Sequence, residues 1–184
     1  MAGAKFPWIR SPGGAPVWPR GGPAVIIPAT MPKIDLSKAP RGAGSRYPKP
    51  FDEPCRARRW LKLGEAAGLT QFGVNLVTLP PGCWSSQRHW HTHEDEFVQV
   101  VSGEVVLATD AGEEPLRAGD CAAFKAGDGN GHQVQNRSER EAVLLVVGAR
   151  SDDDRVEYPD VDLAAGPGNR SGPLVFRHKD GRAY

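Results

Sequence analysis

Short runs in which apolar and polar residues alternate follow one another between residues 58 and 150, and turns rich in glycine, proline or aspartate separate them. Such alternation is typical of strands that bury one face. It predicts strands over residues 58–63, 72–79, 85–91, 96–101, 104–109, 113–116, 121–126, 132–136 and 142–147. Residues 64–68 are expected to form a loop. Because no convincing amphipathic helix lies between the strands, the sequence predicts an all-β fold, an antiparallel sandwich or barrel of the jelly-roll type.

The segments on either side of this region differ from it in composition. Residues 1–57 are rich in proline and glycine, which disfavour a helix or a central strand, so an extended N-terminal arm is expected. Apolar residues such as Trp8 and Trp18 are more frequent in it than in a free linker. We therefore expect the arm to pack on the core or on a second subunit. Residues 58–150 would form the barrel and residues 151–184 a C-terminal extension.

The composition indicates a single domain that has no nucleic-acid or anionic-membrane partner. With 184 residues, of which 39% are hydrophobic and 24% charged, the chain can bury a single sizeable core. A formal net charge of +1 and the lack of a long basic run give no broad attraction to phosphate backbones or to anionic lipid. We therefore expect neither nucleic-acid binding nor membrane association.

The cysteines and the N-terminus bear on the compartment. Cys55, Cys83 and Cys121 are far apart and show no Cys-x-x-Cys spacing, which favours three reduced thiols. Residues 1–10 lack the apolar core of a secretory signal, and no apolar stretch is long enough to span a bilayer. These features predict a cytoplasmic protein.

Three histidines and a glutamate form the most specific chemical pattern in the chain. In a strand, His89 and His91 point to the same face. A turn through residues 92–95 would let Glu96 face the same interior from the next strand. His132 opens a later strand, after a glycine-rich loop, and can approach the pair only through the fold. Because imidazole and carboxylate groups suit manganese, iron, cobalt, nickel, copper and zinc, we expect one divalent transition metal ion at His89, His91, Glu96 and His132.

Neighbouring polar residues allow other assignments. A pair formed by His91 and His93 would leave the carboxylate of Glu96 too close for the connecting turn, so this pair is disfavoured. Gln87 shares the strand face of the first two ligands and is expected to line the pocket. Its amide would either orient a ligand or donate a hydrogen bond to substrate.

Two further polar features receive structural interpretations. The acidic run Asp152-Asp153-Asp154 has too few oxygen ligands at defined spacing for calcium and is expected to be a solvated loop. No helix is expected after the glycine-rich residues 127–131, so this loop has no helix N-terminus with which to bind a phosphate.

The ligand residues lie in two segments that resemble the sequence motifs of the cupin family. Gly82 to Gly103 is similar to the first motif, in which a His-x-His pair is followed by a glutamate and then a glycine. Gly119 to Asn136 resembles the second motif, whose closing histidine and asparagine match His132 and Asn136. Two motifs in this order are more specific than either one alone.

The resemblance covers about residues 69–148 and implies a double-stranded β-helix, the cupin barrel, usually in a homodimer. It places the metal inside the mouth of the barrel and attaches His132 to the other three ligands. Lys125 stands where the second motif usually has proline, and the loop before His132 is longer than usual. We therefore expect this chain to differ from other cupins in the shape of the barrel mouth.

The resemblance leaves open whether the site is catalytic. Cupins include isomerases, epimerases, lyases and dioxygenases, so the leading hypothesis is a metal-dependent enzyme acting on a small polar metabolite by Lewis-acid or dioxygen chemistry. Proton transfer would need a base, for which Glu94 and Asp95, otherwise turn residues, are the candidates. The alternative is a non-catalytic cupin module that binds a small molecule through its metal.

Overall fold

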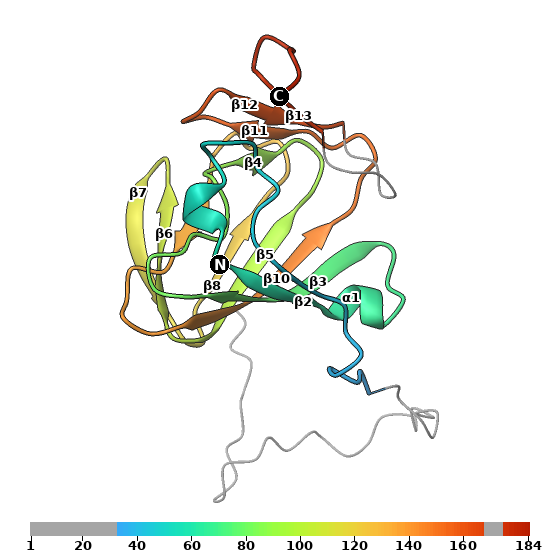
Figure 1. Ribbon diagram of the computed structural model, residues 1–184, viewed down its shortest axis with the longest axis vertical. Coiled ribbons are helices and arrows are strands. Elements are labelled where there is room, and N and C mark those ends of the chain that lie inside the picture. The colour runs from blue at the N-terminus through green and yellow to red at the C-terminus, as the bar shows by residue number, and fades with distance from the viewer. Residues whose placement is uncertain (1–32, 168–174) are drawn as a thin grey trace, which may run out of the picture. The chain divides into compact units, whose positions relative to one another are not determined.

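Most strands of the chain pair into a six-stranded antiparallel sheet and a second layer that faces it (Figure 1). The computed structural model describes residues 33–167 and 175–184. The strands of the six-stranded sheet, in spatial order, are β1 (Arg41–Ala43), β2 (Arg59–Lys62), β3 (Phe72–Leu79), β10 (Ala142–Ala149), β5 (Glu96–Ser102) and β8 (Cys121–Phe124).

The second layer is built from two smaller sheets. One contains β7 (Gly112–Arg117), β6 (Glu104–Thr109) and β9 (Gln133–Gln135). The other contains β13 (Phe176–Arg177), β12 (Leu163–Ala165), β11 (Val156–Tyr158) and β4 (Trp90–His91). Isolated antiparallel bridges between Trp84 and Gln135 and between His89 and His132 join the two sheets. The predicted all-β fold is confirmed.

The helical content of the described residues is small. A 3₁₀ turn, η1, spans Glu53–Cys55, and a single α-helical turn, α1, spans Leu63–Ala66. The prediction of a loop over residues 64–68 is therefore wrong in part, because one turn of helix is too short to produce a periodic apolar pattern. No helix in the described part of the chain has the length and apolar character needed to cross a membrane.

The inner face of the six-stranded sheet follows from its register. Leu144 lies opposite Val100 on one side and Val77 on the other. Directly opposite residues of an antiparallel pair share a face, and Val100 and Leu144 are almost completely buried. Their neighbours two positions along each strand therefore also point between the layers.

The apolar core lies between the two layers. Residues of both layers contribute to it, and burial of their apolar surface is the main stabilising contribution to the fold. The core residues are Leu79, Cys83, Val98, Val100, Val105, Leu107, Leu116, Val134, Ala142 and Leu144.

Gly103 lets the chain pass from β5 in the first layer to β6 in the second. Its φ of 84° is in the left-handed region that favours glycine. A Cβ atom there would lie 2.8 Å from the Cα of Ala142 and from the carbonyl oxygen of Glu141, both backbone atoms. The passage of the chain from β5, the strand that begins with Glu96, into β6 therefore requires glycine at position 103.

The flanking segments add strands to both layers. Within residues 33–57, β1 pairs with β2, while Tyr47 and Phe51 pack on a second apolar cluster formed by β11 and β12. The C-terminal residues extend the second layer through β11, β12 and β13 (Figure 1). The part of the predicted arm that precedes residue 33 lies outside the described residues.

The buried core generates a stability prediction. Leu79 is completely buried, so Leu79→Ala should lower the free energy of unfolding by about 2–5 kcal/mol through lost transfer energy and a residual cavity. Leu69, which is 37% exposed, provides the matched control, and Leu69→Ala should change it by about 0.5 kcal/mol or less. Urea unfolding measures both changes. Equal losses in the two variants would contradict this description of the core.

Candidate metal centre

The four residues predicted as metal ligands line one cavity between the two layers. Its volume is about 590 Å³, and its wall on one side is the inner face of the six-stranded sheet. His89, His132 and, on β4, His91 enter it from the second layer, and Glu96 enters it from the first position of β5. The structure thus brings together residues that are up to 43 positions apart in sequence.

Backbone pairing places His89 beside His132. The N–H of His89 donates to the carbonyl oxygen of His132 at 3.1 Å, and the N–H of His132 donates to that of His89 at 2.8 Å. Two residues that exchange both hydrogen bonds lie directly opposite each other, with their side chains on one face. Their ring centroids are 4.6 Å apart.

The potential ligand atoms of the set are close together. Those of His89, His91 and Glu96 all lie within 4.8 Å of one another. Nε2 of His132 is 2.8 Å from Oε2 of Glu96, and Nε2 of His89 is 3.8 Å from the same oxygen. Glu96 is therefore within reach of every imidazole in the set.

Hydrogen bonds fix the orientation of two of the rings. Nδ1 of His89 lies 2.9 Å from the carbonyl oxygen of Gln87, and Nδ1 of His91 lies 2.7 Å from Oδ2 of Asp154. Since both partners are acceptors, Nδ1 carries the proton in each ring and Nε2 keeps its lone pair. Partners of this kind are the usual supports of metal-binding histidines.

Two of the three histidine rings pack against aromatic side chains. Phe124 stacks on His132 with ring centroids 3.6 Å apart and an interplanar angle of 5°, and Tyr158 stacks on His89 at 5.9 Å. Nδ1 of His132 is buried and has no hydrogen-bond partner within the part of the chain that the structure describes. Packing on Phe124, together with the contact to Glu96, therefore sets the position of this ring.

Burial and neighbouring charges set the protonation states of the site. Burial lowers the pKa of His89 to about 3, so its imidazole is neutral at neutral pH. Burial acts to raise the pKa of Glu96, but the hydrogen bond from His132 and the nearby imidazoles outweigh it and lower that pKa to about 2. A neutral imidazole and an ionised carboxylate are the states that metal coordination requires.

Asp154 is a component of the site that the sequence did not reveal. The acidic run to which it belongs was expected to be a solvated loop, but Asp154 is buried. It accepts hydrogen bonds from Nδ1 of His91 and, at 2.9 Å, from the backbone N–H of His93. Burial opposes ionisation of His91, yet the contact with Asp154 raises the pKa of His91 and so makes its imidazole more basic.

The expectation that the Gln87 side chain lines the pocket is wrong. Its amide nitrogen donates to the carbonyl oxygen of Phe51 at 2.7 Å, and only its backbone carbonyl reaches His89. The reason is local backbone irregularity, since consecutive residues Ser85 and Ser86 both line the cavity, which strict strand alternation forbids. Regular strand geometry here is confined to Trp90 and His91.

The turn between His91 and Glu96 brings a further carboxylate to the cavity. Glu94 lines it and accepts a hydrogen bond from the backbone N–H of Ser151 at 2.7 Å. Burial raises the pKa of Glu94, which makes it a better proton acceptor than an exposed carboxylate. His93 is exposed, and its ring lies against the Thr92 hydroxyl at 2.8 Å, so the alternative His91–His93 pair is not formed.

Glu94 also belongs to a second possible metal-ligating group. Ligand atoms of His91, Glu94 and Asp154 lie within 4.8 Å of one another. His91 is common to both groups, and its Nδ1 already faces Asp154. The first group therefore has the free ring nitrogen of His91 directed to it, whereas the second group would have to use the nitrogen that already donates to Asp154.

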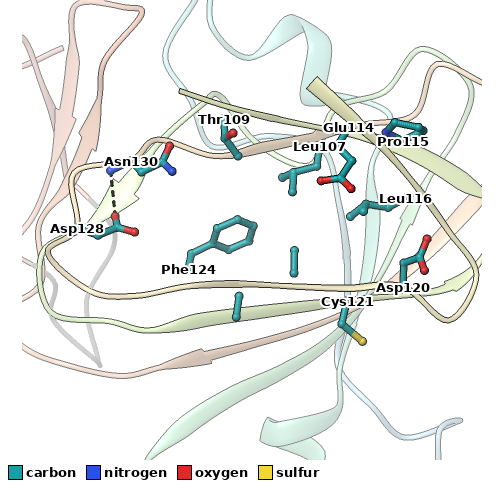
Figure 2. A pocket seen from close by; sticks show the side chains of 12 residues that line it. Leu107, Thr109, Glu114, Pro115, Leu116, Asp120, Cys121, Phe124, Asp128 and Asn130 are labelled. Atoms are coloured by element: carbon teal, nitrogen blue, oxygen red, sulfur yellow. Dashed lines mark hydrogen bonds between the residues drawn. The ribbon is translucent and has the colours of Figure 1, made fainter. Parts of the chain in front are cut away.

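A separate cavity of about 470 Å³ lies between β6, β7 and β8 (Figure 2). Figure 2 shows the Phe124 ring pointing into this cavity, with the carboxylates of Glu114, Asp120 and Asp128 around its margin. Because Phe124 also stacks on His132, it lies between this cavity and the candidate metal centre.

The donor set fits a divalent transition metal. Three imidazoles and one carboxylate are ligands that manganese, iron, cobalt, nickel, copper and zinc accept, whereas calcium and magnesium prefer oxygen donors. Four protein ligands leave positions open on an octahedral ion for water or substrate. The residues present therefore could hold a reactive metal rather than a purely structural one.

Comparisons with known proteins agree with the fold and the two motifs. The sequence model of the cupin domain matches residues 75–148. A solved sugar phosphate isomerase of a cupin superfamily from Silicibacter pomeroyi is 46% identical, with a TM-score of 0.78 over 83% of this chain and 96% of that one. A putative sugar phosphate isomerase from Acidithiobacillus ferrooxidans is 33% identical, with a TM-score of 0.60 over 65% and 76% of the two chains.

No curated protein matches the sequence. The extent and identity of the match to the Silicibacter pomeroyi structure nevertheless establish the family. The all-β fold, the paired motifs and these similarities lead to one conclusion: the chain belongs to the cupin superfamily.

Proposed function

We propose that the protein is a metal-dependent isomerase that acts on a small sugar or sugar phosphate. The observation that carries the proposal is the convergence of His89, His91, Glu96 and His132 in a cavity that also contains the carboxylate of Glu94. These residues supply both parts of a proton-transfer site, a place for a Lewis acid and a base.

The proposed metal would be held by His89, His91, Glu96 and His132. When bound, a divalent ion polarises a carbonyl or hydroxyl group of the substrate as a Lewis acid, which acidifies the neighbouring C–H bond. Asp154 and the Gln87 carbonyl keep the two imidazoles of the His-x-His pair in the tautomer that presents Nε2 to the cavity.

Glu94 is the residue that we assign to proton transfer. It lies two positions before Glu96, lines the same cavity and is held by the N–H of Ser151. Its partly buried carboxylate can take a proton from C2 of an aldose and return it to C1. Together with transfer of the C2 hydroxyl proton to the carbonyl oxygen at C1, this converts the aldose into a ketose. Asp95 also lines the cavity but is less suited, because it is exposed whereas Glu94 is partly buried.

The similar structures support this reaction class. Two of the similar structures that are more than 30% identical, those from Silicibacter pomeroyi and Acidithiobacillus ferrooxidans, carry names of sugar phosphate isomerases, the second as a putative one. Isomerisation by proton transfer also suits a cavity that combines polar groups at one end with apolar residues at the other. These observations favour Lewis-acid chemistry over the dioxygen chemistry that the cupin fold also accommodates.

The ligand assignment predicts the metal content of a variant. His91→Ala removes an imidazole whose ring nitrogen faces the cavity, so the purified variant should hold less than about one tenth of the metal bound per wild-type chain. His178→Ala is the matched control, because His178 contacts Asp162 instead. Elemental analysis by mass spectrometry measures both. Unchanged metal content in His91→Ala would show that the ligand assignment is wrong.

The assignment of Glu94 predicts a catalytic defect without loss of metal. In metal-loaded Glu94→Gln, kcat for the sugar phosphate that the wild type isomerises should fall by about 10²–10⁴, the usual contribution of a general base. Asp95→Asn, which alters the adjacent carboxylate, should retain kcat within about threefold. Substrates are found by incubating the wild type with aldose and ketose phosphates in D₂O and following deuterium incorporation by NMR.

Two results would count against the proposed function. Full activity of Glu94→Gln would remove Glu94 from the proton-transfer step. If the metal-loaded wild type binds sugars or sugar phosphates but neither converts them nor exchanges their protons, a non-catalytic binding module becomes the correct description.

A further inference from the structure

We infer that Lys62, Asn75 and Arg150 form a subsite for a phosphate group, across the six-stranded sheet from the candidate metal centre. The inference rests on the proposed function for the identity of the substrate, but the subsite itself is argued from the geometry of the cavity wall. All three residues line the cavity that contains the four candidate ligands.

The register of the sheet places the subsite. Glu96 on β5 lies opposite Gly148 on β10, and Gly148 lies opposite Gly73 on β3. Because Glu96 faces the cavity, the positions of both glycines face it as well. In the line of opposite residues that runs across the sheet from Glu96 through Gly148 to Gly73, only Glu96 therefore has a side chain.

The two glycines leave the wall open for a ligand. A Cβ atom at Gly148 would have the carbonyl oxygen of Asp95, at 3.9 Å, as its nearest neighbour, so the fold has room for a side chain there. Neither glycine has the positive φ that would require glycine for backbone reasons. Two strand spacings separate Glu96 from Gly73, roughly 10 Å, which suits a small sugar phosphate lying extended across the sheet.

Hydrogen-bond donors converge above Gly73. A Cβ atom at this position would lie 3.6 Å from Nη2 of Arg150 and 3.7 Å from Nδ2 of Asn75. A guanidinium group and an amide thus approach the same point on the cavity wall. Guanidinium N–H groups match the oxygens of a phosphate and form charge-assisted hydrogen bonds with them.

Lys62 adds a second positive charge beside this point. It lies directly opposite Asn75 in the pairing of β2 with β3, so the two side chains share the inner face. Its ammonium group is 2.7 Å from Glu65, in a pair that is about 40% exposed on both sides. Such a pair contributes little stability, and an ammonium has three donors, so Lys62 can also bind an anion.

The arrangement gives the substrate a direction in the cavity. The phosphate would bind at Lys62, Asn75 and Arg150, and the carbonyl end would extend over Gly148 to the candidate ligands and Glu94. A phosphorylated substrate should therefore be strongly preferred over the same sugar without phosphate, because only the phosphate forms charge-assisted hydrogen bonds with Lys62 and Arg150.

The test compares phosphate binding by two doubly substituted proteins. Metal-loaded wild type, Lys62→Gln/Arg150→Gln and the control Lys38→Gln/Arg117→Gln are titrated with inorganic phosphate by calorimetry. The control removes the same number of positive charges from exposed ion pairs with Asp35 and Glu104. We expect phosphate affinity to fall by about tenfold or more in the first variant and by less than about twofold in the control.

A single isosteric change provides an independent test. Asn75→Asp keeps the shape of the side chain but replaces a donor by a negative charge, so phosphate binding should be abolished while the metal content of the protein stays that of the wild type. Wild-type affinity for phosphate in this variant or in Lys62→Gln/Arg150→Gln would overturn the subsite. So would a wild type that does not bind phosphate.

Failure of the isomerase proposal is distinguishable from failure of the subsite. If phosphate binding depends on Lys62 and Arg150 but no sugar phosphate is converted, the subsite stands and the proposed reaction is wrong. If sugar phosphates are converted equally well by the wild type and by Lys62→Gln/Arg150→Gln, the reaction stands and the subsite is wrong.

Discussion

The reciprocal hydrogen bonds between His89 and His132 are the interaction on which the rest of the structure depends. They join the sheet that contains β9 to the sheet that contains β4, and so make one continuous layer from two. The same pair of bonds sets two imidazoles side by side over the cavity. The backbone contact that joins the two sheets of the second layer therefore also carries two of the proposed ligands.

The residues of the six-stranded sheet that line the cavity change from apolar to polar along the strands. Along β10, the residues that point inward change from Leu144 and Val146 to Gly148, and Arg150 follows directly after the strand. Leu144 and Val146 lie toward the core, where water is excluded, and Gly148 and Arg150 line the polar part of the cavity. A single strand thus contributes to stability at one end and to the proposed binding of substrate at the other.

Local sequence patterns predicted the parts of the site that depend on local geometry. Most predicted strands are confirmed with shifted ends, and the turn after His91 returns Glu96 to the cavity. The strand predicted over residues 85–91 is reduced to Trp90 and His91, and β1 and β11 to β13 were not predicted. Gln87 was misplaced because the parity argument fails where the backbone departs from regular strand geometry. Asp154 could not have been found from its own sequence context, since its neighbours resemble a solvated acidic loop. Its contact with His91 spans 63 positions and arises only when β11 pairs with β4.

The central claim is that one metal ion is bound jointly by His89, His91, Glu96 and His132. The most direct measurement is an anomalous-difference electron-density map from crystals of the metal-loaded protein, recorded on both sides of the absorption edge of the metal. We expect one peak per chain within bonding distance of these four side chains, roughly 2.0–2.2 Å for zinc with nitrogen and oxygen ligands. A peak between Nδ1 of His91, Glu94 and Asp154, or no peak in this cavity, would contradict it.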